Sequence, residues 1–459
     1  MAKLVSTNPA RNYEVIGEVE VSSEKEIQEK VEAAQNAKQE WKALGVAKRV
    51  ELLREVHRMF EENKEALAQL VTKEMGMPIS QSRVNDVDSG LYYFKWYLDN
   101  AEKYLAPEVT YEDEKAIHTV YHEPYGVAGV IVPWNFPFSN FIWGVGQNLL
   151  AGNTVVIKHS EECPLFGKAI EEVTAKSPLP DGVFNVVYGD GKVGSYLARQ
   201  NINSISFTGS TAVGKPLYKI AAEKLIHVCL ELGGSAPGII FEDAELEGAV
   251  DGLYFSRFGN CGQACDALKR LIVHESRFDE VVNRFKEYLE ARKVGDPQDE
   301  STEVGPLVAK RQLRLLAAQV RDAIRKGAGV ATGGKAPKGL KGAYFLPTLL
   351  TAVTPNMRVW QEEVFGPVLP VVSFKTEEEA IQLANDTKYG LGSYIFTKDK
   401  DRAARVAGML EAGMVSVNNV TYLQPSSPFG GYKQSGIGRE HGKFGFSDVS
   451  QVKVVATEK

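Results

Sequence analysis

Cysteine is scarce in this chain of 459 residues, which contains Cys163, Cys229, Cys261 and Cys265 and no others. Four cysteines in a chain of this length are too few for a disulfide scaffold. Cys261 and Cys265 form a C-x3-C pair, but no second pair or histidine cluster completes a zinc site. We therefore expect free thiols and no metal ion.

Long apolar stretches and clusters of basic residues are also missing. The longest apolar stretch, near Val127–Val132, is far too short to cross a bilayer. The start, Met1-Ala2-Lys3-Leu4, lacks the apolar region of a secretion signal. A net charge of −6 without a basic run argues against nucleic acid as a partner. These absences predict a cytoplasmic protein, and its length predicts two or three domains.

The pattern of apolar residues divides the chain into regions. The first hundred residues are predicted to be mostly helical, and residues 109–121 resemble an exposed ribbon. Predicted strands then alternate with helices up to residue 232, which indicates a doubly wound parallel sheet. The alternation resumes beyond Gly234 and predicts a second α/β domain. A final strand is expected at residues 447–455, paired with the ribbon.

Two glycine-containing loops compete for the phosphates of a dinucleotide. Residues Gly189 to Gly194 fit the G-x-G-x-x-G pattern after a predicted strand. Phe207-Thr208-Gly209-Ser210, followed by Gly214, is an equally good cradle, because it places backbone N–H groups and a hydroxyl at a helix N-terminus. Local spacing does not decide between the two loops.

Three short motifs carry groups suited to attack on a carbonyl. Gly262-Gln263-Ala264-Cys265 presents a thiol, Leu230-Glu231-Leu232-Gly233-Gly234 a carboxylate, and Pro133-Trp134-Asn135-Phe136-Pro137 an amide. A thiol can attack a carbonyl, an amide can hold the resulting oxyanion, and a carboxylate can act as a base. The alternatives are an inert buried thiol, a capping carboxylate and a turn-forming asparagine.

With these motifs placed, nearly the whole chain resembles the NAD(P)-dependent aldehyde dehydrogenase superfamily. Two further motifs, Glu363-Val364-Phe365-Gly366-Pro367 and Pro428-Phe429-Gly430-Gly431, complete the ordered set. The resemblance implies a Rossmann-type cofactor domain, an α/β catalytic domain and a split β oligomerisation ribbon in a homodimer or homotetramer. The expected boundaries are 1–107 and 125–232 for the cofactor domain, 233–424 for the catalytic domain, and 108–124 and 425–459 for the ribbon and tail.

The resemblance also implies roles for individual residues. Cys265 would be the nucleophile, Asn135 would hold the oxyanion with the Cys265 N–H, and Glu231 would activate water to cleave a thioester. The cofactor would be NAD, with NADP possible. Lys158 and Glu161 would hold the ribose, and Gly189 would form a turn near the adenine. The other residues expected at the cofactor are Trp134, Gly209, Ser210, Leu232, Glu363 and Phe365.

Two residues near the nucleophile depart from the pattern of this superfamily. Asp266 follows Cys265, where a small or neutral residue is more common, and a carboxylate facing the sulfur would disfavour the thiolate. We expect it instead to point away and cap a following helix. Cys261 stands where an amide or hydroxyl residue is common. It is either a second buried thiol or a redox partner of Cys265. The buried thiol is favoured, because a disulfide requires a specific geometry that the spacing of the two cysteines does not establish.

The substrate is expected to be a neutral aliphatic or aromatic aldehyde. Members that oxidise semialdehydes carry an arginine at positions that are Trp143 and Gly259 here, and Arg257 is expected at the surface. Trp143, Leu423 and Phe429 would line the pocket. The alternative within the class is a semialdehyde dehydrogenase. A CoA-acylating enzyme would lack the Glu231 base, and a purely structural role would not need Cys265, Glu231 and Asn135 together.

Overall fold

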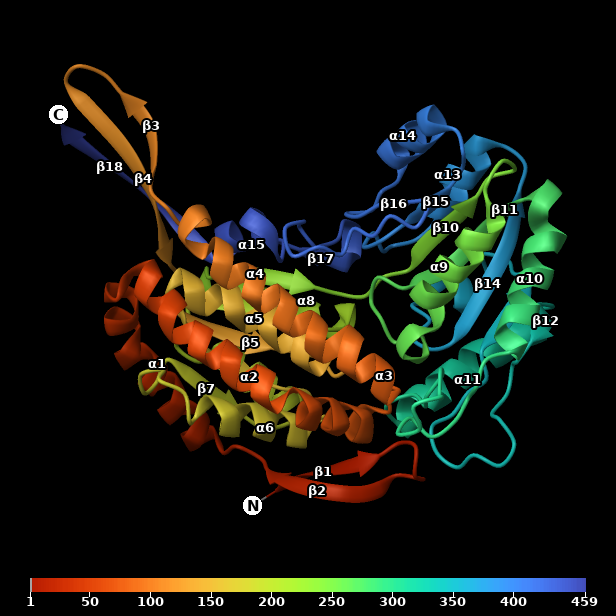
Figure 1. Ribbon diagram of the computed structural model, residues 1–459, viewed down its shortest axis with the longest axis horizontal. Helices are drawn as coiled ribbons and strands as arrows, with labels where there is room; N and C mark the ends of the chain where they lie inside the picture. Colours follow the sequence, from red (N-terminus) through yellow and green to blue (C-terminus); the bar gives the residue numbers. More distant parts are fainter. Residues whose placement is uncertain (1) are drawn as a thin grey trace.

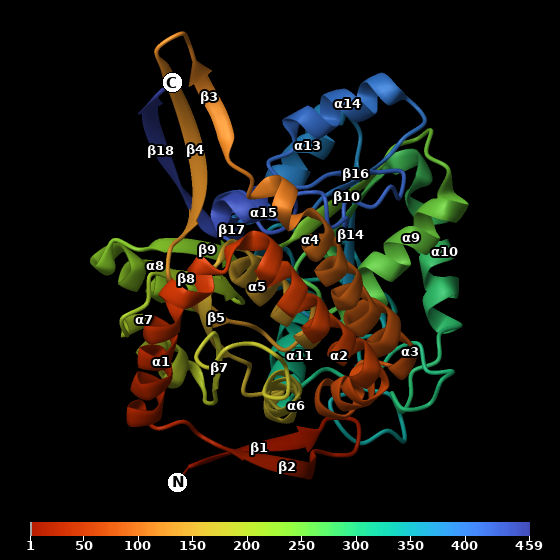
Figure 2. The same ribbon diagram turned by 60° about the vertical axis from the view of Figure 1, so that its left-hand side comes forward.

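Two large β-sheets and a projecting ribbon organise the protein. The computed structural model describes residues 2–459 (Figure 1). The first sheet and its helices are formed mostly by the N-terminal half of the chain, and the second sheet by the C-terminal half (Figure 2). No helix in residues 2–459 is long and apolar enough to cross a membrane.

The first sheet has six strands: β5 (Val127–Ile131), β6 (Thr154–Lys158), β7 (Phe184–Val187), β8 (Ser204–Thr208), β9 (His227–Glu231) and β17 (Gly436–Ile437). Their order is β17-β9-β8-β5-β6-β7, and all except β17 run parallel. The winding reverses between β5 and β8, so a crevice for a ligand is expected at the carboxyl ends of these strands. The doubly wound sheet predicted from the sequence is confirmed.

Helices cover both faces of this sheet, which explains why β5 and β6 are buried along their whole length. One face carries α5 (Pro137–Ala151), over which α2 (Gly45–Met75) and α4 (Ser89–Tyr104) pack (Figure 1). On the other side, α1 (Glu24–Ala43) packs near α7 (Gly191–Arg199) and α8 (Thr211–Lys224). The remaining elements of this half are α3 (Ile79–Gln81), η1 (Ser82–Asp88) and α6 (Pro164–Thr174).

The second sheet has seven strands in the order β12-β13-β14-β11-β10-β15-β16, with only β12 antiparallel to its neighbour. Its strands are β10 (Ala236–Ile240), β11 (Leu268–His274), β12 (Gly329–Thr332), β13 (Thr348–Thr351), β14 (Val368–Phe374), β15 (Tyr394–Phe396) and β16 (Ser416–Val417). Its helical elements are α9 (Leu246–Phe258), η2 (Gly259–Gly262), η3 (Glu275–Arg277), α10 (Phe278–Glu290), α11 (Lys310–Arg325), α12 (Arg358–Gln361), α13 (Glu377–Asn385) and α14 (Lys400–Met409).

The ribbon joins two distant parts of the chain. β18 (Ser450–Glu458) pairs antiparallel with β4 (Ala116–Pro124), which also pairs with β3 (Glu108–Glu112). The predicted pairing of the last strand with the ribbon is therefore confirmed, although its first residues belong instead to α15 (Gly442–Asp448). A short helix, η4 (Lys433–Ser435), precedes β17.

The first hundred residues contain a feature that the sequence pattern did not predict. They begin with an antiparallel hairpin of β1 (Lys3–Asn8) and β2 (Glu14–Glu20). The helices α1, α2 and α4 follow as expected. The buried residues of β1 are the polar Ser6 and Asn8, and most of β2 is exposed, so the strands lack the apolar alternation by which strands are recognised.

Candidate active site

The carboxyl ends of the first sheet bring the sequence-predicted residues together. Asn135 lies in the loop after β5, Lys158 ends β6, and Glu231 ends β9. Gly209 and Ser210 connect β8 to the N-terminus of α8. Residues far apart in the sequence therefore meet at one edge of the sheet, as the topology requires.

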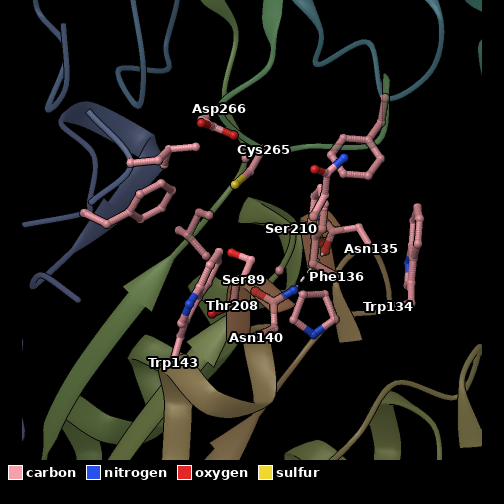
Figure 3. A pocket seen from close by; sticks show the side chains of 18 of the residues that line it. Ser89, Trp134, Asn135, Phe136, Asn140, Trp143, Thr208, Ser210, Cys265 and Asp266 are labelled. Atoms are coloured by element: carbon pink, nitrogen blue, oxygen red, sulfur yellow. Dashed lines mark hydrogen bonds between the residues drawn. The ribbon is translucent and has the colours of Figure 1, made fainter. Parts of the chain in front are cut away.

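A cavity of about 710 Å³ opens at this edge, and Cys265 points into it (Figure 3). Of the predicted site residues, those that line it are Trp134, Asn135, Trp143, Gly209, Ser210, Leu232, Cys265, Glu363, Phe365, Leu423 and Phe429. Lys158, Glu161, Gly189 and Glu231 do not line it. Within residues 2–459, no group of three or more histidine, cysteine or acidic side chains is arranged to hold a metal ion.

The loop that presents Cys265 depends on an unusual backbone. Asn260, Cys261 and Gly262 follow α9 with φ angles of 49°, 54° and 73°. A Cβ on Gly262 would lie 2.5 Å from the carbonyl oxygen of Gly366, so only glycine fits. Beneath the loop, the buried Lys269 Nζ donates to the Cys265 carbonyl oxygen at 2.9 Å. The loop is thus held from both sides.

The surroundings of Cys265 favour the protonated thiol over the thiolate. Burial raises its pKa well above the usual range, and the nearby Asp266 carboxylate raises it further. Lys269 opposes this shift with its positive charge. Reaction at neutral pH therefore requires removal of the thiol proton.

Asn135 is oriented by its neighbours and keeps one amide proton free. Its Nδ2 donates to the carbonyl oxygen of Gln263 at 3.0 Å, and its Oδ1 accepts from Asn140 Nδ2 at 3.3 Å. Its own carbonyl oxygen accepts from Asn260 Nδ2 at 2.7 Å. An amide nitrogen carries two protons, so the second is available beside Cys265 for an oxyanion.

Glu231 is placed behind the cavity wall. Its side chain is 2% exposed, and within residues 2–459 neither carboxylate oxygen has a hydrogen-bond partner. Burial, followed by the charge of Glu440, raises its pKa well above the usual range. A Cβ on Gly430 would lie 2.8 Å from Oε1, so the carboxyl group packs against that backbone. To act on water near Cys265, this side chain must first turn toward the cavity.

The features expected to hold a dinucleotide are present around the switch point. Ser210 caps α8 without using its hydroxyl within the helix, which leaves an open helix N-terminus suited to an anion. Lys158 and Glu161 form an ion pair of 3.3 Å. Burial lowers the pKa of Lys158. Gly189 forms a tight turn with a φ of 158°, in which a Cβ would collide with Val193. These residues fit the cofactor that the resemblance implies.

Glu363 and Phe365 connect the cofactor side of the cavity to the cysteine loop. Glu363 Oε1 accepts from the Gly234 N–H at 3.1 Å and from Lys269 Nζ at 3.3 Å. The Phe365 ring meets Trp134 edge-on, with centroids 5.5 Å apart. One carboxylate therefore contacts both the Leu-Gly-Gly turn and the residue that supports Cys265.

Two expectations about charged residues are wrong. Arg257 is fully buried rather than at the surface, and it donates to the carbonyl oxygens of Val364 at 3.0 Å, Val368 at 2.9 Å and Gly366. It braces the segment that carries Glu363. Asp266 caps no helix, because the chain enters strand β11 after it; its Oδ2 accepts instead from the Tyr422 hydroxyl at 3.2 Å.

Several supporting residues escaped the sequence reasoning. Asp86 in η1 accepts from the N–H groups of Phe138 at 3.2 Å and Ser139 at 2.8 Å, and so caps α5 directly after the Asn135 loop. Burial raises the pKa of Asp86 to about 7. Lys269 lies in strand β11, four residues after the nucleophile, and neither it nor Asp86 belongs to one of the motifs.

The apolar wall contains Trp143, whose ring lies 6.2 Å from Phe429 and 5.5 Å from Tyr93 between centroids. Leu423 lies at the exposed rim. Gly259 lines an adjoining cavity of about 440 Å³. Neither of the positions expected for an arginine anchor therefore supplies a positive charge.

Comparison with known proteins agrees with this geometry. A sequence model of the Aldehyde dehydrogenase family matches residues 2–455. The mitochondrial succinate-semialdehyde dehydrogenase of Arabidopsis thaliana is 37% identical over 455 residues, covering 99% of this chain and 86% of that protein. Retinaldehyde dehydrogenase 3 of Homo sapiens is 38% identical over 460 residues, covering 99% and 89%.

A solved structure extends the agreement to three dimensions. The NAD+ complex of an aldehyde dehydrogenase from Bacillus cereus has a TM-score of 0.96 at 34% identity, covering 100% of this chain and 93% of that one. The two sheets, the cysteine loop and the ribbon described above thus form a known architecture. By sequence over nearly its whole length and by fold, the chain belongs to the aldehyde dehydrogenase family.

Proposed function

We propose that this protein oxidises an aldehyde to a carboxylic acid with NAD, using Cys265 as the nucleophile and without transfer to CoA. The observation that carries the proposal is the shared cavity. It contains the Cys265 thiol and the Asn135 amide with its free proton, and the open N-terminus of α8 lies at its edge. A thiol, an oxyanion donor and an anion-binding helix end are the groups that this oxidation needs.

The Cys265 thiol first gives its proton to water in the cavity. The first bond then forms between the thiolate sulfur and the carbonyl carbon as the carbonyl electron pair moves to oxygen. The free proton of Asn135 Nδ2 and the Cys265 backbone N–H stabilise that oxyanion, which exists only after attack, so their effect lowers the barrier. Bound NAD would accept the hydride released from the tetrahedral carbon, which leaves a thioester on Cys265.

The second stage releases the acid. Glu231, once turned toward the cavity, accepts a proton from water as the water oxygen attacks the thioester carbon. The carbon–sulfur bond then breaks, and the released thiolate takes the proton from Glu231, which restores both the thiol and the carboxylate. The buried, unpaired carboxyl group supports this role, because burial raises its pKa and a carboxylate with a raised pKa is a stronger base.

NAD is proposed as the preferred cofactor. Glu161 would accept hydrogen bonds from ribose hydroxyl groups and repel a 2′-phosphate, whereas Lys158 would attract one. The preference is therefore modest, and NADP remains a usable cofactor. A higher kcat/KM with NADP than with NAD would contradict it.

The substrate is proposed to lack a carboxylate, because Trp143 and Gly259 stand where arginine anchors would be needed. A semialdehyde dehydrogenase is the second candidate, favoured by the 37% identity to the Arabidopsis succinate-semialdehyde enzyme. We also propose a cytoplasmic homodimer or homotetramer, the domain boundaries given above, and the ribbon of β3, β4 and β18 as its contact surface. Exposed valines on β18 support that surface.

The direct test is NADH or NADPH formation with a panel of aldehydes and both cofactors. Cys265→Ala is expected to abolish oxidation while cofactor binding, followed by quenching of protein fluorescence, stays intact. Asn135→Ala is expected to lower turnover by roughly 10²–10³-fold, as for the loss of one oxyanion donor. Near-normal turnover of either folded variant would refute its assigned role.

A further inference from the structure

We propose that the pocket selects aldehydes with a positive charge close to the carbonyl group, and that Asp266 is the residue that determines this preference. Quaternary ammonium aldehydes are the chemical class that fits. The proposal rests on the function proposed above and adds to it the sign of the substrate's charge.

The first observation concerns the charged residues that line two adjoining cavities, which together form the substrate space. The cavity of about 710 Å³ at Cys265 adjoins the one of about 440 Å³, and Asp266 lines both. Among residues 2–459, no lysine, arginine or histidine lines either cavity, whereas three carboxylates do: Asp88, Asp266 and Glu363. An anionic substrate would therefore meet carboxylates and no basic partner.

Two of these carboxylates already have a basic partner. Asp88, at the half-exposed rim, pairs with Lys64 at 3.1 Å. Glu363 pairs with the buried Lys269 at 3.3 Å and faces the cofactor side. Asp266 forms no salt bridge with any residue in the part of the chain that the structure describes. Of the three carboxylates it is the one without a salt bridge, although the positive charge of the buried Lys269 favours its charged form.

Asp266 is also held in place. Its Oδ2 accepts from the Tyr422 hydroxyl at 3.2 Å, and its carbonyl oxygen accepts from the Tyr394 hydroxyl at 3.0 Å. The two tyrosine hydroxyls lie 3.0 Å apart. Asp266 follows Cys265 in the chain, and Figure 3 shows both at the same end of the pocket, so a cation paired with this carboxylate would lie on the side of the reacting carbon. Burial raises the pKa of Asp266, and a bound cation would favour its charged form.

Aromatic rings supply the rest of the environment. Tyr93, Phe136, Trp143 and Phe429 line the cavity opposite the cofactor loops. Aromatic faces attract cations, and the attraction is strongest where water is excluded. A quaternary ammonium group needs no hydrogen-bond acceptor, so aromatic faces and the Asp266 carboxylate are sufficient to bind it.

Isosteric substrate pairs test the proposal. In 4-(trimethylammonio)butanal and 5,5-dimethylhexanal, a quaternary nitrogen replaces a quaternary carbon, and betaine aldehyde and 3,3-dimethylbutanal form a shorter pair. For at least one pair, the wild-type enzyme is expected to show a kcat/KM about tenfold higher for the cation. Because both substrates meet the same thiol, the ratio cancels any change in Cys265 reactivity.

Asp266→Asn is expected to bring that ratio close to one, whereas Asp88→Asn, the matched control at the rim, leaves it within about twofold of the wild-type value. A wild-type ratio of one or less for both pairs would overturn the proposal without any variant. A ratio unchanged in Asp266→Asn, or lost only in Asp88→Asn, would overturn the role of Asp266. If wild-type enzyme oxidises no aldehyde at all, the proposed function itself fails.

Discussion

At the scale of single residues, the reaction depends on two groups whose burial favours the uncharged form. Burial raises the pKa of both Cys265 and Glu231 well above their usual ranges. Each group must therefore lose its proton, or change its surroundings, during the cycle. Two substitutions separate these requirements.

Glu231→Gln is expected to permit formation of the thioester and block its hydrolysis, because glutamine cannot accept the proton from water. The measurement is rapid-mixing detection of NADH, which should show a burst of up to about one equivalent per site and then a slow phase. Intact-mass spectra should show an acyl group on Cys265. A uniform fall in rate with neither burst nor adduct would mean that Glu231 acts earlier or not at all.

Asp266→Asn is expected to lower the pKa of the Cys265 thiol, because it removes the second cause of the upward shift and leaves burial as the first. Since the thiolate is the reactive form, the rise of reactivity with pH should move to lower pH. The rate of alkylation by iodoacetamide against pH measures this without any substrate. Asp88→Asn is the control, and a shift to higher pH in Asp266→Asn would contradict the assignment.

Residue patterns predicted the reactive groups but not their neighbours. Cys265, Asn135 and the glycine loops stand in motifs whose chemistry can be argued from residue types. Asp266 and Arg257 were misplaced, because the partners that decide their positions lie far along the chain. The Tyr422 hydroxyl donates to Asp266, and Arg257 donates to carbonyl oxygens of the segment after Glu363.

At the scale of elements, the loop after α9 is the most constrained part of the site. Gly262 adopts a φ of 73° against the Gly366 carbonyl oxygen, whereas Gly259, three residues earlier, has no atom closer than 4.0 Å to an added Cβ. The two glycines form a matched pair for substitution by alanine.

Gly262→Ala is expected to destabilise the protein by at least about 1–2 kcal/mol, from the left-handed backbone alone, and to reduce activity by displacing Cys265. Gly259→Ala is expected to retain both stability and activity. Thermal unfolding and NADH formation measure the two effects. Equal melting temperatures for the two variants would show that the loop tolerates the displacement.

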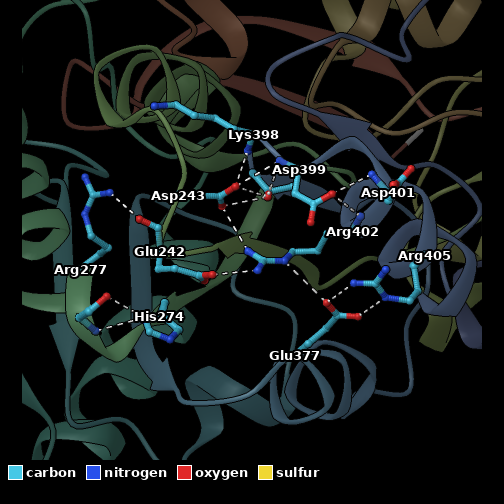
Figure 4. A network of polar contacts seen from close by, with 12 residues as sticks. Glu242, Asp243, His274, Arg277, Glu377, Lys398, Asp399, Asp401, Arg402 and Arg405 are labelled. Atoms are coloured by element: carbon cyan, nitrogen blue, oxygen red, sulfur yellow. Dashed lines mark hydrogen bonds and ion pairs between the residues drawn. The ribbon is translucent and has the colours of Figure 1, made fainter.

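A different arrangement stabilises the far end of the second sheet. Arg402 on α14 lies between Glu242 at 2.8 Å, Asp243 at 3.2 Å and Glu377 at 3.7 Å (Figure 4). Asp243 also accepts from the Thr397 hydroxyl at 2.9 Å. None of these residues lines the substrate space. The network connects the loop after β10 to α13 and α14 through salt bridges, whereas Asp266 is held by a hydrogen bond from a tyrosine.

At the scale of the whole molecule, the sign of the substrate's charge is the property that the cavity controls. Hexanal or benzaldehyde is expected to show a kcat/KM at least roughly tenfold above that of succinate semialdehyde, a margin of about 1.4 kcal/mol, because a carboxylate here would lack a cationic partner. Trp143→Arg should narrow or reverse this gap. Steady-state kinetics of the wild-type enzyme and of Trp143→Arg measures the two ratios. A wild-type preference for succinate semialdehyde would contradict the prediction.

The architecture was predictable because alternating strands and helices allow few arrangements, and the doubly wound sheet is one of them. The pattern did not predict the elements at the edges of the fold. The exposed hairpin β1–β2 carries no apolar alternation, and β17 is only two residues long. The two hairpin strands pair with each other and pack against α2 and α6, whereas β17 pairs with the distant β9. Local periodicity detects neither arrangement.

The position of β17 also bears on how the protein is made. Gly436 pairs with Glu231, and the Leu232 N–H donates to the Ser435 carbonyl oxygen at 2.8 Å. During synthesis, domains fold from the N-terminus onward, so the first sheet forms while its β9 edge has no neighbour. That edge stays open until the ribosome has added almost the entire chain. Premature termination shortly before residue 436 would leave an unpaired strand edge, a template for aggregation, at the very strand that carries the proposed base.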